Sequence, residues 1–113
     1  MIPHDSIVAL ATPSGAGAIA VIRISGQDAI TIGNSVFKSI KNKELTTQKT
    51  HTLHLGHIMD GSKTLDEVLV SIFKGPNSYT GENTIEISCH GSTYIQQQII
   101  QLLLRKGCRM ANA

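Results

Sequence analysis

Two oppositely charged side chains lie in segments with the alternation of β-strands, and their chemistry suits the binding of a polar ligand. Arg23 stands between two isoleucines in one segment, and Glu86 stands between two isoleucines in another. A guanidinium fork can hold a carboxylate or a polar ring edge, and a fixed carboxylate can accept two parallel N–H donors. The simpler interpretation is structural. On strand statistics alone, Arg23 would be an edge-strand residue in a surface ion pair, and Glu86 could pair with it across a sheet.

Cys89 and His90 form a second candidate pair, of the kind that supports nucleophilic catalysis by a thiol. On a strand, neighbouring side chains point to opposite faces, so the thiol and the imidazole are not expected to share a hydrogen bond. A buried thiol beside a structural histidine is the preferred interpretation. The start of a following helix could still lower the pKa of Cys89 and make it reactive.

Three histidines, His51, His54 and His57, recur at every third position. A helix would align them, but the surrounding residues predict a strand, on which His54 faces the opposite way from the other two. We therefore expect no metal site here. A thiol or metal enzyme built on Cys89 and these histidines is kept only as an alternative.

The composition excludes several classes of protein. A chain of 113 residues that is 41% hydrophobic predicts one globular domain, and 16% charged residues are too few for a disordered chain. No apolar run is long enough to span a membrane and no signal peptide is recognisable, so we expect a cytoplasmic protein without membrane contact. Cys89 and Cys108 suit reduced thiols better than a disulfide framework.

Four lysines cluster in one polar stretch, at positions Lys38, Lys41, Lys43 and Lys49. No aromatic residues interleave with them, and a net charge of +2 is too small to argue for nucleic acid. The stretch is more typical of a solvated loop, which would touch RNA only as an accessory contact to phosphate.

The elements that position these residues follow from hydrophobic periodicity. Alternation predicts strands at residues 6–11, 19–25, 52–59, 67–73 and 84–89, with a possible further strand from residue 108. Helical spacing predicts one helix that Ser25 caps and that ends near Ile40, and another at residues 93–105 that Ser92 caps. We expect an α+β domain: a mixed, mostly antiparallel sheet of about five strands with two main helices.

Turn residues separate these elements. Residues 75–81, which include Pro76 and Asn77, predict a rigid turn just before the strand of Glu86, and residues 60–63 predict a tight turn. Residues 15–20 match the loose dinucleotide pattern G-x-G-x-x-A, but the β-branched residues that follow predict a strand rather than the required helix. The sequence also contains no G-x-x-x-x-G-K-[S/T] phosphate loop, so GTP binding is not assigned to these residues.

Two long motifs resemble a known family over essentially the whole chain. They run from residue 5 to 26 and from residue 75 to 91, and read D-S-I-V-A-L-A-T-P-S-G-A-G-A-I-A-V-I-R-I-S-G and G-P-N-S-Y-T-G-E-N-T-I-E-I-S-C-H-G. Both are similar to the N-terminal domain of the MnmE (TrmE) family, the GTPases that modify the wobble uridine of tRNA. The chain departs from the usual family pattern at Ala16 and Ala18 in the first turn, and at Ser92 in the segment His90-Gly91-Ser92.

The resemblance implies a tetrahydrofolate-binding fold and function for residues 1–113. It places Arg23 and Glu86 among the contacts to 5-formyltetrahydrofolate or 5,10-methylenetetrahydrofolate, with Glu82 a weaker candidate and a third, basic contact beyond Ala113. It also implies a homodimer, an FAD-dependent partner of the MnmG type, tRNA bound through the full complex, and GTP, Mg and K bound by a GTPase domain outside this chain. The fragment alone is not expected to be catalytic. The alternative is a dimerisation module with an incomplete folate pocket.

Overall fold

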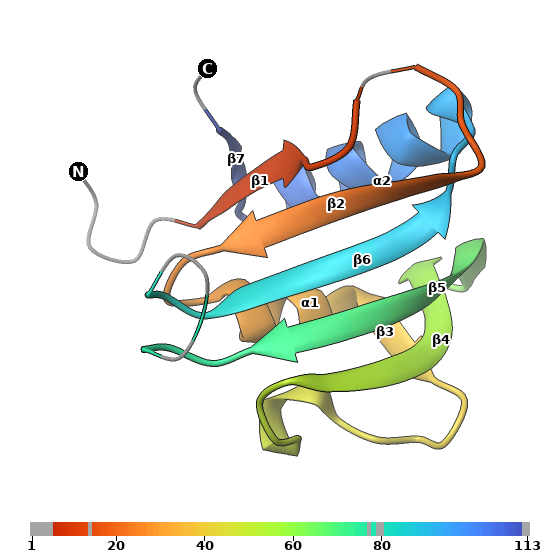
Figure 1. The fold of residues 1–113 in the computed structure, drawn as a ribbon. Helices are drawn as coiled ribbons and strands as arrows, with labels where there is room; N and C mark the ends of the chain where they lie inside the picture. The colour runs from red at the N-terminus through yellow and green to blue at the C-terminus, as the bar shows by residue number, and fades with distance from the viewer. Residues whose placement is uncertain (1–5, 14, 77, 79–80, 112–113) are drawn as a thin grey trace.

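The computed structural model describes residues 6–13, 15–76, 78 and 81–111 of the chain. Figure 1 follows the elements from one end to the other. In chain order they are β1 (Ile7–Leu10), β2 (Ile19–Ser25), α1 (Ala29–Val36), β3 (Phe37–Ser39), the 3-10 helix η1 (Leu45–Thr47), β4 (Thr52–Asp60), β5 (Lys63–Phe73), β6 (Thr84–His90), α2 (Thr93–Arg105) and β7 (Arg109–Met110).

The strands of the described residues form one sheet in the order β3-β4-β5-β6-β2-β1-β7. Every neighbouring pair is antiparallel except β1 and β7, which are parallel. The predicted α+β class with a mixed, mostly antiparallel sheet and two helices is confirmed. The sheet has seven strands rather than about five, because the short strands β3 and β7 are added at its two edges.

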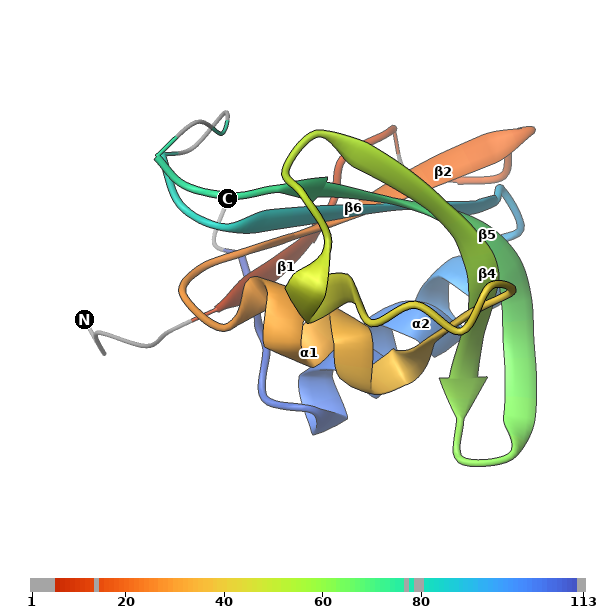
Figure 2. The same ribbon diagram turned by 90° about the horizontal axis from the view of Figure 1, so that it is seen from below.

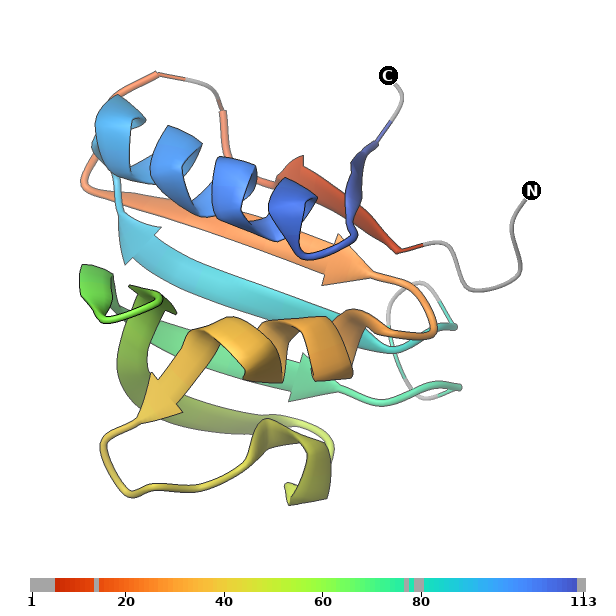
Figure 3. The ribbon, with the colours of Figure 1, turned by 180° about the vertical axis from the view of Figure 1, so that it is seen from behind.

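Both helices cover the same face of the sheet. Figure 3 shows α1 and α2 side by side over that face, and Figure 2 shows both of them below the sheet. The strand residues that face the helices are almost fully buried, and α2 packs Ile99, Leu102 and Leu103 against them. The strand part of this core consists of Val8, Ala20, Ile22, Ile24, Ile58, Val68, Val70, Ile72, Ile85, Ile87 and Cys89. The opposite face, which is nearer the viewer in Figure 1, is not covered by either helix, and we call it the open face.

The first helix ends earlier than predicted. It stops at Val36 instead of near Ile40, because Phe37–Ser39 form β3 and pair with β4. Phe37 is buried and its ring lies over Gly56, where an added Cβ atom would be only 2.6 Å from the ring. Strand pairing and burial of this aromatic ring outweigh another helical turn, and Ile40 is left 53% exposed.

The start of that helix also differs from the prediction. Ser25 is the last residue of β2, and the N-cap position belongs to Asp28, whose side chain makes no capping hydrogen bond. The backbone N–H of Asp28 instead donates to Oγ of Ser6 at 3.3 Å. Ser6, which is distant in sequence, therefore accepts the free N–H at the start of the helix, and Ser25, the predicted cap, does not.

The other long elements agree more closely with the sequence. The second helix has the predicted bounds, Oγ of Ser92 accepts the N–H of Ile95 at 3.4 Å, and Gly107 follows with a φ of +113°. Strand β5 begins at Lys63, four residues earlier than predicted, because Lys63 and Thr64 pair with the end of β4. A register shift after Ile58 adds a residue there and hides the alternation of the strand. No described helix is long and apolar enough to cross a membrane.

Candidate functional site

Arg23 and Glu86 lie directly opposite each other on the neighbouring strands β2 and β6. Nε and Nη2 of Arg23 donate to the same carboxylate oxygen, Oε2 of Glu86, at 2.9 and 2.7 Å. The two side chains are 35% and 28% exposed and project from the open face, since their strand neighbours are buried on the other. The cross-strand pair expected for Glu86 is present. The expectation of an edge strand for Arg23 is wrong, because β2 lies between β6 and β1.

The geometry of this ion pair leaves one side of the carboxylate available. Both hydrogen bonds from Arg23 go to Oε2, and Oε1 of Glu86 accepts none from the described part of the chain. A partly exposed ion pair contributes at most about 1 kcal/mol to folding. The arginine therefore orients the carboxylate on a rigid strand, while Oε1 can accept an N–H donor from a ligand.

The strand register extends this pair into a row across the open face. Glu86 is paired with Ser71 of β5, which is paired in turn with Leu53 of β4. Adjacent strands are about 4.8 Å apart, so Leu53 lies about 10 Å from Glu86. We call this set the charged row: Arg23, Glu86, Ser71 and Leu53. The parallel set beside it is the apolar row: Val21, Ser88, Leu69 and Leu55.

The segment before β6 is fixed by Asn83, which the sequence did not single out. Its Oδ1 accepts the N–H of Gly75 at 3.0 Å, and its carbonyl accepts the N–H of Gly26 at 3.0 Å. Gly81 has a φ of +79°, which agrees with a turn, while Asn77 lies outside the described residues. Glu82 is exposed in this segment, away from the row of Glu86.

The glycine-rich turn before β2 packs against the junction of β6 and α2. The N–H of Gly17 donates to the carbonyl of Gly91 at 3.0 Å, and the N–H of Gly91 donates to the carbonyl of Ala18 at 3.2 Å. A Cβ atom on Gly91 would lie 2.0 Å from the carbonyl oxygen of Gly17. The strand that follows this turn agrees with the rejection of a dinucleotide site. The close contact between the two backbones requires a glycine at position 91, and the φ of +100° at Gly15 is one that glycine adopts readily.

Cys89 and His90 do not form a catalytic pair. The buried carboxylate of Asp66 holds His90, accepting its backbone N–H at 2.8 Å and lying 2.7 Å from its ring Nδ1. Burial, together with the negative charge of Asp66, raises the pKa of Cys89 to about 11. The expectation that a helix start could lower this pKa is wrong, because burial and the nearby carboxylate raise it.

The three spaced histidines are not brought together. His51 precedes β4 and packs edge-on against Phe73, with 5.3 Å between the ring centroids. His54 bonds to Thr52, and His57 lies 3.7 Å from the carboxylate of Glu67. No three His, Cys, Asp or Glu side chains among the described residues are placed to hold a metal ion.

Comparison with known proteins identifies the family. The family described as "GTP-binding protein TrmE N-terminus" matches residues 6–113. The chain is 88% identical over 113 residues to the "tRNA modification GTPase MnmE" of Flavobacterium johnsoniae, and 80% identical over 113 residues to that of Flavobacterium psychrophilum. All of this chain and 24% of each of those proteins are covered.

The similarity extends to more distant bacteria. The "tRNA modification GTPase MnmE" of Moorella thermoacetica is 50% identical over 109 residues, which cover 95% of this chain and 24% of that protein. The chain thus spans about a quarter of the length of the curated relatives that it matches. Since the family profile covers nearly all of the chain, it belongs to the TrmE N-terminal family.

Proposed function

We propose that this chain binds a one-carbon derivative of tetrahydrofolate through Glu86 and Arg23. A pterin ring presents adjacent N–H donors on one guanidine-like edge, and an ionised carboxylate is the natural acceptor for such an edge. The observation that supports this most directly is the orientation of Glu86. Arg23 holds its Oε2, and Oε1 takes no hydrogen bond from the described residues.

We also propose that the open face joins two copies of the chain. Large apolar side chains are exposed there, with Ile19 66% exposed, Leu69 43% exposed and Leu55 38% exposed. They lie in and beside the apolar row, next to the charged row, so a second copy could cover them while the charged row takes the ligand. Desolvation of such side chains is the usual source of affinity between subunits.

In the larger protein, this domain would supply the one-carbon donor for modification of the wobble uridine of tRNA. Relatives that carry the domain are named as tRNA modification GTPases. GTP, Mg and K would bind elsewhere in such a protein, tRNA would bind through the full complex, and an FAD-dependent protein of the MnmG type would share the chemistry on the base. This activity would take place in the cytoplasm.

Calorimetric titration with 5-formyltetrahydrofolate tests the binding site. Glu86→Gln keeps the shape of the side chain but turns one acceptor into a donor, so affinity should fall about 10- to 100-fold. Glu67→Gln is the matched control, because Glu67 is also an exposed glutamate of the open face but lies outside the charged row. Equal loss of affinity in both variants, or no loss in Glu86→Gln, would remove Glu86 from the site.

The alternative is that the chain only mediates dimerisation. This alternative predicts a stable dimer that binds no folate. Sedimentation measures the oligomeric state, and it is recorded in the buffer used for the calorimetric titration. Leu69→Asp should yield monomers, whereas Tyr94→Asp, a change at a 66% exposed residue of α2, should leave the dimer intact. A dimer that survives Leu69→Asp would show that the open face is not the interface.

A further inference from the structure

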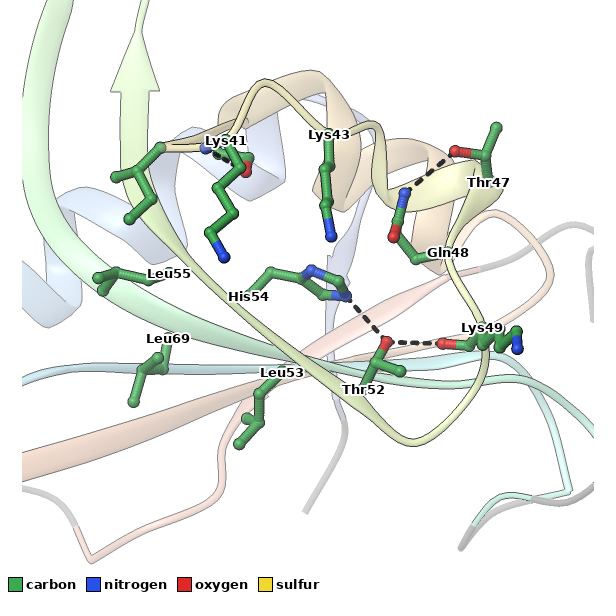
Figure 4. Close-up of a pocket in the computed structure, with 12 residues that line it drawn as sticks. Lys41, Lys43, Thr47, Gln48, Lys49, Thr52, Leu53, His54, Leu55 and Leu69 are labelled. Atoms are coloured by element: carbon green, nitrogen blue, oxygen red, sulfur yellow. Dashed lines mark hydrogen bonds between the residues drawn. The ribbon is translucent and has the colours of Figure 1, made fainter.

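A hollow of about 700 Å³ lies at the free edge of β4. It is bounded by the first residues of that strand and by the segment that leads from β3 through η1 to β4. Figure 4 shows it with its lining side chains. The lysines that line it are not part of the site described above, and the sequence suggested only a solvated loop for their segment.

The hollow is positively charged. Lys41, Lys43 and Lys49 line it, and its lining residues include no aspartate or glutamate. Lys41 and Lys43 extend into it toward the ring of His54 (Figure 4). Neither lysine forms an ion pair with an acidic side chain of the described residues. Two unpaired ammonium groups that converge on one concavity favour an anionic ligand.

His54 does not add to the positive charge of the hollow, and its hydrogen bond with Thr52 and its pKa explain why. The hydroxyl of Thr52 donates to the carbonyl of Lys49 at 2.6 Å, so its oxygen accepts the Nε2–H of His54 at 2.8 Å. Burial, and then the charge of Lys43, lower the pKa of His54. The imidazole is therefore neutral near pH 7, and the lysines supply the positive charge.

The hollow adjoins the candidate ligand site at Leu53. Leu53, Leu55 and Leu69 form its apolar side, and Leu53 is also the last member of the charged row. A ligand that begins at Glu86 and crosses Ser71 reaches the rim of the hollow after about 10 Å. Reduced folates have a matching order of groups: a pterin with N–H donors, a flat benzamide bridge, and glutamate carboxylates at the far end.

We propose that Lys41 and Lys43 form a carboxylate subsite that holds the glutamate tail of the folate whose pterin is bound at Glu86. This inference rests on the folate binding proposed above and adds how the site recognises the rest of the ligand. The bridge lies over Leu53, and the tail crosses the free edge of β4 to the two ammonium groups. Additional γ-linked glutamates supply additional carboxylates, so polyglutamylated folates bind more tightly.

A phosphodiester of RNA is the other anion with matching chemistry. The observations favour the small carboxylate tail, because the hollow is concave, is lined on one side by leucines and shares Leu53 with the charged row. A surface that follows an RNA backbone would carry a larger excess of positive charge than the net +2 of this chain, and aromatic residues for the bases.

The test compares two ligands, 5-formyltetrahydrofolate and its triglutamate form, by calorimetry at low and at moderate salt. With the parent chain, the triglutamate should bind about tenfold more tightly, and added salt should reduce this preference. The double variant Lys41→Gln, Lys43→Gln should lose the preference. The control variant Lys63→Gln, Lys106→Gln removes two exposed lysines that do not line the hollow and should keep it.

The possible results distinguish the tail subsite from folate binding itself. Equal affinities of the parent chain for both ligands, or a preference that survives in the double variant, would overturn the tail subsite while leaving folate binding in place. Absence of binding by either ligand would overturn the proposed function and the subsite together. If the double variant instead weakens binding of tRNA and leaves both folate affinities unchanged, the hollow is an RNA contact and the subsite is refuted.

Discussion

Replacing Asp66 by alanine should destabilise the fold far more than a surface substitution does. The side chain of Asp66 is only 7% exposed, and its two oxygens hold the end of β6 through the backbone N–H and the ring Nδ1 of His90. Loss of the acceptor for the backbone N–H costs about 1–3 kcal/mol, and loss of the bond to the 69% exposed ring costs about 1 kcal/mol or less. We expect a total loss of about 1–4 kcal/mol.

Urea unfolding followed by far-ultraviolet circular dichroism measures this loss, since the chain contains no tryptophan to report by fluorescence. His90→Ala is the matched control, because it removes the ring bond but keeps the backbone N–H and its carboxylate acceptor. The difference between the two variants isolates the backbone bond. If Asp66→Ala costs no more than His90→Ala, the buried carboxylate does not stabilise the end of this strand and the reasoning is refuted.

The negative charge of Asp66 can be tested through its effect on the reactivity of Cys89. Asp66 contributes, after burial, to the raised pKa of Cys89. Asp66→Asn should therefore lower that pKa and speed alkylation of the native thiol at pH 8, although burial keeps the pKa above its ordinary value. Cys108 is the internal control, because burial alone raises its pKa. An unchanged rate at Cys89 would contradict the electrostatic part of the argument.

Three further outcomes follow from the geometry. Gly91→Ala should cost more than about 2 kcal/mol in urea unfolding, since its Cβ would lie 2.0 Å from a backbone oxygen, whereas Gly61→Ala, with open space around it, should cost about 1 kcal/mol. The thiols of Cys89 and Cys108 have pKa values of about 11 and should react with iodoacetamide at least about tenfold faster in urea than in the native chain at pH 8. The lowered pKa of His54 means that the unfolded chain binds its proton more readily, so this residue should make stability fall as the pH drops below about 6.5. Titration of the ring by NMR should show that pKa rising in Lys43→Met, and no change on that substitution would exclude Lys43 as a cause.

Hydrophobic periodicity predicted the helix and the strand that bury one whole apolar face in the core. Strand β2 and helix α2 have the expected bounds, because each repeats its apolar side chains without interruption over 7 and 13 residues. Strand β3 was missed because Phe37–Ser39 is too short to show alternation, and its conformation depends on pairing with β4. The early start of β5 was missed because a register shift there hides the period of the strand.

The sequence predicted only part of the candidate site. The pairing of Arg23 with Glu86 was foreseeable, since both lie at the polar positions of strands. The contact between Asp66 and His90 joins residues 24 positions apart, and no local pattern predicts the register that aligns them. The convergence of Lys41 and Lys43 on one hollow depends on the path of an irregular segment, which composition does not determine.

The pairing of β2 with β6 sets when this site forms during folding. The hairpin of β4 and β5 closes through a two-residue turn, whereas Arg23 and Glu86 are 63 positions apart. The longer closure costs about 2 kcal/mol more in chain entropy, so the local hairpin has the lower barrier. A partly folded chain that contains only the hairpin has no charged row. A ligand of that row therefore binds the native state alone, and its concentration directly raises the free energy of unfolding.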